Sequence, residues 1–268
     1  MGKHIVMVKM GTVWDRTAEF LTDNLPAILP IALLAYFVPF SIMGSLAPIL
    51  YQTHGVMAAL WAVVFALAVL VNWGGLTLIV MALDKGNDPG KEALRHLAPS
   101  LLLSILQFCA VVALALPAIL TIQLSGTGVD AMTLALPIAV VWALSLYCVL
   151  ALGLSVWLGA RLLLVNAVVV AEGRWFGAIL RSWKLTRGSA LAIIGVTILY
   201  AVVAVVGMLA TQLVFGSIFR LVAGQSDGLS LSNILTSVMV AAVQAGFTVI
   251  VPVFSAKLYQ ALVSAKHA

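Results

Sequence analysis

The stretch that decides the fold of this chain runs from residue 24 to residue 83: NLPAILPIALLAYFVPFSIMGSLAPILYQTHGVMAALWAVVFALAVLVNWGGLTLIVMAL. Its 60 residues, between Asp23 and Asp84, include no Asp, Glu, Lys or Arg. Roughly 20 helical residues cross a bilayer core about 30 Å thick, and a charge at its centre costs about 2.5–3.5 kcal/mol. The polar turn Tyr51-Gln52-Thr53-His54-Gly55 divides the stretch. The stretch therefore predicts two membrane spans joined as a hairpin.

Four further runs without charged residues follow along the chain. They contain 34 residues after Arg95, 30 after Asp130, 32 after Arg187 and 29 after Asp227. None shows the apolar and polar alternation of a membrane β-strand. We therefore predict an all-α, polytopic membrane protein with a single membrane domain over residues 1–268. Its six transmembrane helices are expected at about 25–50, 56–83, 98–123, 134–160 or 143–170, 189–216 and 233–256.

The composition of the whole chain supports the same class. Of the 268 residues, 63% are hydrophobic and 9% are charged, and the mean hydropathy is +1.18. Soluble domains contain roughly 45–50% apolar and about 25% charged residues. Because too few polar side chains remain to cover a globule in water, the composition excludes an ordinary soluble enzyme, a disordered tail and a secreted disulfide scaffold.

The basic residues indicate the orientation in the membrane, because cytoplasmic loops retain Lys and Arg. On the predicted topology, Arg220 alone of the 14 basic residues lies on one side. The others, on the opposite side, are Lys3, Lys9, Arg16, Lys85, Lys91, Arg95, Arg161, Arg174, Arg181, Lys184, Arg187, Lys257 and Lys266. We expect a bacterial inner-membrane protein with both termini in the cytoplasm. Its net charge of +5 is expected to attract anionic phospholipid headgroups rather than nucleic acid.

A short amphipathic segment precedes each odd-numbered predicted span. The first lies within residues 1–24, the second ends in Ala93-Leu94-Arg95, and the third, with the similar letters Ile179-Leu180-Arg181, lies within residues 171–188. The repeated order predicts three related units, each a hairpin preceded by a cytosolic amphipathic helix. The alternative is that any six-helix protein has basic cytosolic loops.

The third segment is the clearest candidate for a surface that binds lipid or a partner protein. At 100° per residue its apolar side chains fall within an arc of about 140°, with basic side chains outside it, as in helices that lie on a membrane. The apolar residues are Trp175, Phe176, Ile179, Leu180 and Trp183. The candidate binding residues are Trp175, Arg181, Trp183, Lys184 and Arg187.

The position of Arg161 depends on where the fourth span ends. The apolar stretch from residue 131 to residue 170 would form one helix about 60 Å long, twice the hydrocarbon thickness. If the span is 134–160, Arg161 lies at the interface, where its side chain reaches the headgroups, and residues 162–170 either lie along the membrane surface or fold back against the protein. If the span is 143–170, Arg161 lies inside the membrane and is expected to form a buried polar pair with Glu172.

The residues from Arg161 onwards also resemble a known family pattern. Arg161 precedes Glu172-Gly173 by eleven positions, and Leu180-Arg181-Ser182, Leu185 and Gly188 follow. This order is similar to that of the glycerophosphoryl diester phosphodiesterase membrane-domain superfamily and of related uncharacterised six-helix bacterial inner-membrane proteins, although Asn166 stands where members often carry a proline. The resemblance is sharpest over residues 155–200. It implies an integral inner-membrane protein of ill-defined role and does not imply phosphodiesterase activity, since only the membrane part is matched.

The sequence offers little evidence of catalysis. It has no nucleophile elbow, P-loop or dinucleotide fingerprint, and Cys109 and Cys148 fall within predicted spans, where thiols act as small apolar fillers. The four histidines are not spaced as metal ligands; they are His4, His54, His96 and His267. We therefore expect no enzymatic activity, no cofactor and no metal.

Two functions remain. The first is a non-enzymatic inner-membrane protein that binds phospholipid or a partner protein and serves assembly, scaffolding or envelope maintenance. The alternative is a transporter or the membrane subunit of a transport complex, which predicts a polar central cavity. Asn72, Gln107, Gln212 and Gln244 lie within predicted spans, where they either line a path or form interhelical hydrogen bonds. Because no acidic residue lies in the middle of a span, we favour the hydrogen bonds.

Overall fold

The computed structural model describes residues 9–50, 57–124, 137–223 and 230–267. Within these ranges the secondary structure is helical with no strand, and six helical segments are long and apolar enough to cross a membrane. The predicted class is confirmed: the chain is a polytopic helical membrane protein. The predicted polar turn at 51–55 and the basic residue Lys3 lie outside the described residues.

A short helix followed by a hairpin occurs three times in the described part of the chain. The first unit consists of α1 (Met10–Asp23), a span built from α2 (Leu25–Ala32), η1 (Leu33–Phe37) and α3 (Val38–Leu50), and α4 (Met57–Ala82). The second consists of α5 (Pro89–Arg95), α6 (Leu97–Leu124), α8 (Ile138–Leu162) and the short helix α9 (Val165–Glu172). The third consists of α10 (Gly177–Thr186), α11 (Ala190–Ala223) and α12 (Leu231–His267). This order is the predicted one, and descent from a repeated unit stays a prediction.

One predicted alternative and one predicted helix boundary were wrong. Of the two alternatives for the fourth span, 134–160 agrees with α8 to within a few residues, whereas 143–170 is contradicted, because α8 ends at Leu162 and a separate helix, α9, follows. The last span does not end near residue 256, since α12 continues past Lys257 to His267. The Lys257 side chain does not need water there, because its Nζ donates a hydrogen bond at 2.9 Å to the Ala82 carbonyl.

Local sequence accounts for the short helix α5. The Asp88 side chain accepts a hydrogen bond from the Lys91 backbone N–H at the start of the helix, and Pro89 occupies the first turn, where no partner for its nitrogen is needed. Hydrogen bonds from Lys91 hold the pKa of the exposed Asp88 carboxyl below its usual value. Arg95 lies in the last turn, where a positive charge favours the helix dipole.

The first span changes its helix type before Pro39. A proline ring clashes with the carbonyl four residues earlier, here that of Ala35, and η1 provides a wider π-helical turn at that place. Opposite η1, Gly74 of α4 lies so close to Ala35 that a Cβ atom at Gly74 would overlap the Ala35 methyl group. Gly74 therefore lets α4 approach η1, and α4 is continuous through this point.

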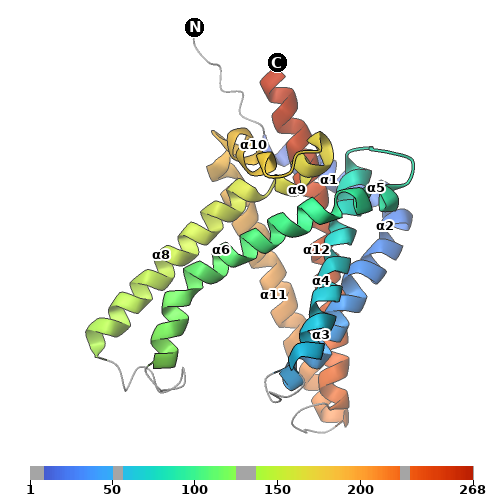
Figure 1. Cartoon of the computed structure of the whole chain (residues 1–268). Coiled ribbons are helices and arrows are strands. Elements are labelled where there is room, and N and C mark those ends of the chain that lie inside the picture. The colour runs from blue at the N-terminus through green and yellow to red at the C-terminus, as the bar shows by residue number, and fades with distance from the viewer. Residues whose placement is uncertain (1–8, 51–56, 125–136, 224–229, 268) are drawn as a thin grey trace.

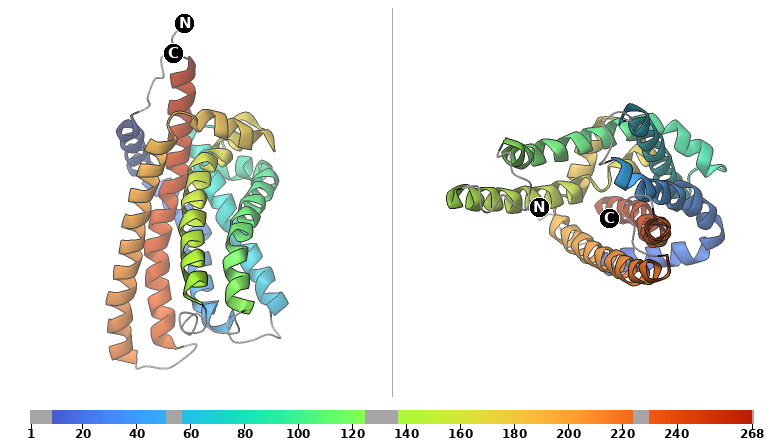
Figure 2. Two further views of the ribbon diagram at one scale, coloured as in Figure 1. Left: turned by 90° about the vertical axis from the view of Figure 1, so that its left-hand side faces the viewer. Right: turned by 90° about the horizontal axis from the view of Figure 1, so that it is seen from below.

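The long helices form a bundle and a divergent hairpin (Figures 1 and 2). Helix α12 packs against α1, η1, α3, α4 and α11. The α6–α8 hairpin meets the bundle at one end of the molecule and diverges from it towards the other end (Figure 1). Its two membrane segments are accordingly almost unburied by the rest of the chain.

Helix α9 lies in the interior at the end where the hairpin and the bundle meet. Val165, Val168, Val169 and Val170 are at most 2% exposed, and they pack with side chains of the neighbouring helices such as Leu258. Of the two predicted positions for the segment after Arg161, a surface position is therefore excluded. The segment folds back against the protein.

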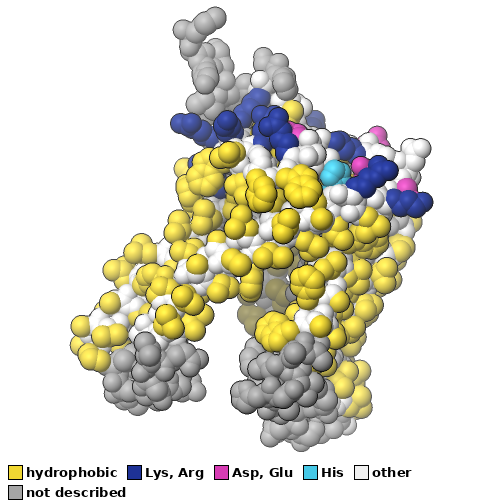
Figure 3. Space-filling model, viewed as in Figure 1, with side chains coloured by type: hydrophobic (Ala, Val, Ile, Leu, Met, Phe, Trp, Pro, Cys, Tyr) yellow, Lys and Arg dark blue, Asp and Glu magenta, His cyan; other side chains and the backbone are white. Residues whose placement is uncertain are grey.

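Charged side chains gather at this same end (Figure 3). We call it the charged end; it consists of α1, α5, α9, α10 and the adjoining ends of α4, α8 and α12. Below it the visible surface is almost entirely hydrophobic (Figure 3). This segregation is the one that a membrane imposes, since charges are expelled from its hydrocarbon layer.

Candidate functional site

The predicted site residues lie around the junction of α8, α9 and α10. The chain leaves α9 at Gly173, whose positive φ of 64° is the left-handed conformation that ends many helices. It then returns as α10 across the end of α9, to which α10 is packed. This turn brings residues of α10 next to both Arg161 and Glu172.

Arg161 is held by two tryptophans. Its guanidinium carbon lies 5.5 Å from the ring centre of Trp157 and 5.2 Å from that of Trp183, and the two rings meet edge to face at 5.0 Å. Its Nε and Nη1 atoms are buried and have no hydrogen-bond partner among the described residues. The Arg161 carbonyl accepts a hydrogen bond from Ser182 Oγ at 2.6 Å. Cation–π contact and this hydrogen bond therefore fasten α8 to α10.

Glu172 binds other partners than the predicted one. Its carboxylate lies 2.8 Å from Arg181 Nε and 3.1 Å from Arg174 Nε, and the Tyr259 hydroxyl donates to it at 3.1 Å. The expected pair of Arg161 and Glu172 is not formed. The break between α8 and α9 places the two residues on different helices, and α10 brings Arg181 to the carboxylate.

A double-mutant cycle distinguishes these two pairings. We expect Glu172→Ala and Arg181→Ala to show a coupling free energy of about 0.5–1 kcal/mol in detergent unfolding, because both charges touch but remain partly solvated. Glu172→Ala and Arg161→Ala are expected to be additive within about 0.5 kcal/mol. A larger coupling for the second pair than for the first would contradict the structure.

Three lysines of the charged end donate hydrogen bonds to backbone carbonyls at or near the ends of other helices. Lys85 donates to the carbonyls of Val170 and Ala171 at the end of α9, Lys257 donates to that of Ala82 at the end of α4, and Lys266 donates to that of Lys184 on α10. The last carbonyls of a helix lack partners within the helix and carry partial negative charge. These lysines therefore hold the helices together and are not available to a ligand.

The five candidate binding residues fall into two groups. Trp183 and Arg181 face the protein, against Arg161 and Glu172 respectively. Trp175, Lys184 and Arg187 are exposed. The predicted arc of α10 is therefore divided: Trp183 belongs to the interior, and its neighbours Phe176 and Leu180, each 67% exposed, complete the outer apolar surface with Trp175.

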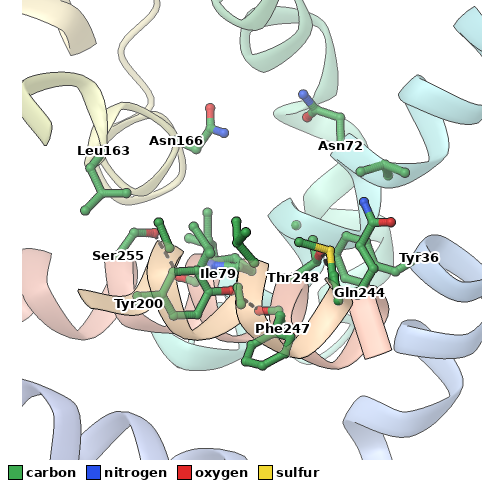
Figure 4. A pocket seen from close by; sticks show the side chains of 18 residues that line it. Tyr36, Asn72, Ile79, Leu163, Asn166, Tyr200, Gln244, Phe247, Thr248 and Ser255 are labelled. Carbon is green, nitrogen blue, oxygen red and sulfur yellow. Dashed lines mark hydrogen bonds between the residues drawn. The ribbon is translucent and has the colours of Figure 1, made fainter. Parts of the chain in front are cut away.

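A second polar region, inside the membrane-spanning part, is a cavity of about 520 Å³ (Figure 4). It lies between α4, α9, α11 and α12, with Tyr36 of η1 at its edge. Its polar lining includes Asn72, Asn166, Tyr200, Gln244 and Thr248. Sequence reasoning identified Asn72 and Gln244, but not Asn166 and Tyr200, because the folding back of α9 is not visible in the pattern of residues.

Some polar residues of the spans form hydrogen bonds between helices. Ser100 Oγ lies 2.8 Å from Asn72 Oδ1 and 3.0 Å from Asn166 Oδ1, and Asn72 Nδ2 donates to Ser104 at 3.0 Å. The expected interhelical hydrogen bonds are therefore confirmed for Asn72. Ser100 and Ser104 lie one turn apart on the same face of α6. This spacing is the signal in the sequence that could have indicated them as hydrogen-bond partners of a neighbouring span.

The glutamines do not form the expected interhelical hydrogen bonds with the described residues. Gln244 lines the central cavity, and Gln107 lines an adjoining cavity of about 370 Å³ between α6 and α8. Gln212 lines a third cavity, between α11 and α12. For Gln107 the reason is the divergence of the α6–α8 hairpin from the bundle, which leaves this face of α6 bordering a cavity. The centre of the protein is thus not sealed and apolar, the arrangement that would have excluded transport.

Comparison of the chain with protein-family models, curated proteins and solved structures gives no match. The fold therefore defines the class: a multi-pass helical membrane protein in which the described helices form hairpins preceded by short amphipathic helices. The resemblance to the glycerophosphoryl diester phosphodiesterase membrane-domain superfamily stays a prediction. Residues that carry it, among them Arg161, Glu172, Arg181 and Ser182, make the contacts of the α8–α9–α10 junction.

Proposed function

We propose that this protein is a non-enzymatic component of a bacterial inner membrane that binds anionic phospholipid at its charged end, in an assembly, scaffold or envelope-maintenance role. The observation that carries the proposal is that exposed basic side chains without an ion-pair partner in the described part of the chain, and exposed large apolar side chains, occur together on α10 and on the residues that flank it. A membrane surface satisfies both kinds of group at once, because it offers phosphate groups above hydrocarbon.

The apolar half of this surface is shared by the three short helices. Trp14 of α1, Leu94 of α5, and Trp175, Phe176 and Leu180 at α10 are all more than 40% exposed. Burying apolar surface gains roughly 25 cal/mol of free energy per Å². These side chains would not gain it if their helices faced water. Their helices are too short to span a bilayer, so the headgroup boundary is the layer that buries them.

The basic half consists of Lys and Arg side chains that form no ion pair within the described part of the protein. Arg174 and Arg181 pair with Glu172, and Arg95 pairs with Glu92 on its own helix. By contrast, Lys184 and Arg187 are exposed and form no ion pair with the residues that the structure describes. Each basic side chain near an anionic surface contributes about 1 kcal/mol to binding, so these two are the strongest candidates.

Neutralising both cations tests the proposal. We expect the Lys184→Gln, Arg187→Gln variant to lose about tenfold or more in its retention of phosphatidylglycerol, measured by native mass spectrometry after reconstitution in mixed lipid. Retention of phosphatidylcholine should change little. The control is the Lys184→Arg, Arg187→Lys variant, which keeps both charges. Equal retention of the two lipids by the unmodified protein would overturn the proposal.

The charge distribution also supports an orientation with the charged end in the cytoplasm, because Lys and Arg next to spans are retained there. Lys184, Arg187 and Lys266 all belong to that end, whereas Arg220 lies near the opposite end of α11. A green fluorescent protein fused after Ala268 is expected to fluoresce in bacterial cells, and alkaline phosphatase fused there to be inactive. The reverse pair of results would refute this orientation.

A further inference from the structure

The central cavity presents polar groups that the protein leaves unsatisfied. The side-chain amide of Gln244 has no hydrogen-bond partner among the described residues, although α12 carries it in the middle of a membrane segment. Asn166 uses its oxygen on Ser100, and its amide nitrogen has no partner in the described part of the chain. Figure 4 shows both amides at the cavity. A polar group left without a hydrogen bond in an apolar medium is costly, so both favour a polar ligand.

The rest of the lining excludes a charged ligand. None of the side chains that line the cavity is an acid or a base. An ion there would lose its hydration without gaining a counter-charge, at a cost of several kcal/mol. Val71, Ile79, Ala204 and Met208 supply apolar surface between the polar groups. The ligand that fits carries no charge, has oxygen atoms at one end and is otherwise hydrocarbon.

The cavity is accessible from the side. Val205 and Val251 line it and are 48% and 38% exposed, respectively, within their membrane segments. Leu163, Asn166 and Val251 also line the cavity between α6 and α8, so the two spaces adjoin each other. Residues of both α6 and α8 line the second space, and this hairpin diverges from the bundle (Figure 1). A molecule dissolved in the bilayer therefore reaches the amides without crossing water.

We propose that this cavity is a binding site for an uncharged membrane amphiphile, with hydroxyl or ester oxygens hydrogen-bonded to Asn166 and Gln244 and a hydrocarbon tail extending towards α6 and α8. The volume of about 520 Å³ lies in the range of sites for small molecules, roughly 300–1,000 Å³. The site shares α9 with the charged end through Asn166 but lies apart from the exposed surface at α10. It involves neither Lys184 nor Arg187. The variants that test the cavity therefore differ from those that test the proposed function, and a negative result for one proposal leaves the other standing.

Photo-crosslinking with three probes that share one diazirine-bearing acyl tail tests the site. The probes are a diacylglycerol, a long-chain alcohol and a phosphatidylglycerol, each used with the full chain in vesicles. Because the diazirine is on the tail, we expect at least one neutral probe to label peptides of α6, α8 or α12 at least fivefold more than the anionic probe does. Equal labelling by all three would show ordinary lipid contact and overturn the proposal.

Two matched substitutions of α11 provide the control. Ala204, which is 7% exposed, lines the cavity, whereas Val202 lies on the opposite face of the same helix and is 54% exposed. Ala204→Trp should fill the space and reduce neutral-probe labelling at least fivefold, while Val202→Trp should leave it unchanged. Equal effects of the two variants would refute the site.

A third variant keeps the size of the cavity, should Ala204→Trp fail to fold. Gln244→Leu removes one amide with little change in volume, and we expect labelling by the neutral probe to fall about threefold to tenfold, as for the loss of one hydrogen bond. The thermal transition of the purified protein in detergent should remain, since the amide has no partner in the described part of the chain. Unchanged labelling in a folded Gln244→Leu variant would contradict the assignment of Gln244 to the ligand.

Discussion

Replacing Gly74 with Ala is expected to lower the free energy of unfolding in detergent by about 1–3 kcal/mol. The added Cβ would overlap the methyl group of Ala35, so α4 and η1 must separate. Both elements contribute buried side chains to a hydrophobic core, among them Tyr36, Leu76 and Leu78. Titration with a denaturing detergent, followed by tryptophan fluorescence, measures the effect.

Two variants show whether the contact with Ala35 is the cause. Gly195→Ala in α11 makes the same chemical change where nothing lies within 4 Å of the new atom, and it should leave stability unchanged or slightly raised. The exchange Ala35→Gly with Gly74→Ala removes the overlap and should recover most of the loss. If the exchange is as unstable as Gly74→Ala alone, the close approach of α4 and η1 is not as described.

Trp183→Ala is the second substitution with a large expected effect, a loss of about 2–3 kcal/mol in the free energy of unfolding. Trp183 covers the Arg161 guanidinium and meets Trp157 edge to face, so its removal leaves a buried cation with one aromatic neighbour and a void between α8 and α10. Detergent titration measures this loss as well.

Trp175→Ala is the matched control, since Trp175 precedes the same helix but is 54% exposed. We expect it to change the free energy of unfolding by less than about 0.5 kcal/mol, as surface substitutions do. If Trp175→Ala instead lowered the free energy of unfolding as much as Trp183→Ala, the described orientation of α10 against the protein would be contradicted.

The number of spans was predictable because charge in hydrocarbon is so costly. Asp23 and Asp84 mark the limits of the first hairpin, and in the structure α2 begins at Leu25 and α4 ends at Ala82. The same rule failed at Lys257, where α12 continues. A charged residue ends a hydrophobic run, but it does not end a helix when a carbonyl of another helix accepts a hydrogen bond from it, as Ala82 does from Lys257. Such a partner is known only from the fold.

Half of the candidate site was also within reach of the sequence. The periodicity of α10 placed Trp175 and Trp183 on one arc, yet the structure turns Trp183 inward and leaves Trp175 outside. A helical period gives relative angles around one axis. It does not say which neighbour lies at each angle, and here Arg161 of α8 occupies the position next to Trp183.

The sequence by itself determined that this is a multi-pass helical membrane protein, how its short helices and hairpins alternate, and that its charge is concentrated at one end. Only the tertiary structure decided that α6 and α8 diverge from the bundle, that α9 folds into the interior, and that Gln244 and Asn166 consequently meet at a cavity. The physical reason is that lipid tails are as apolar as the helices. Hydrophobicity therefore selects the segments that enter the membrane but does not pair their faces, and pairing depends on local contacts such as that of Gly74 with Ala35.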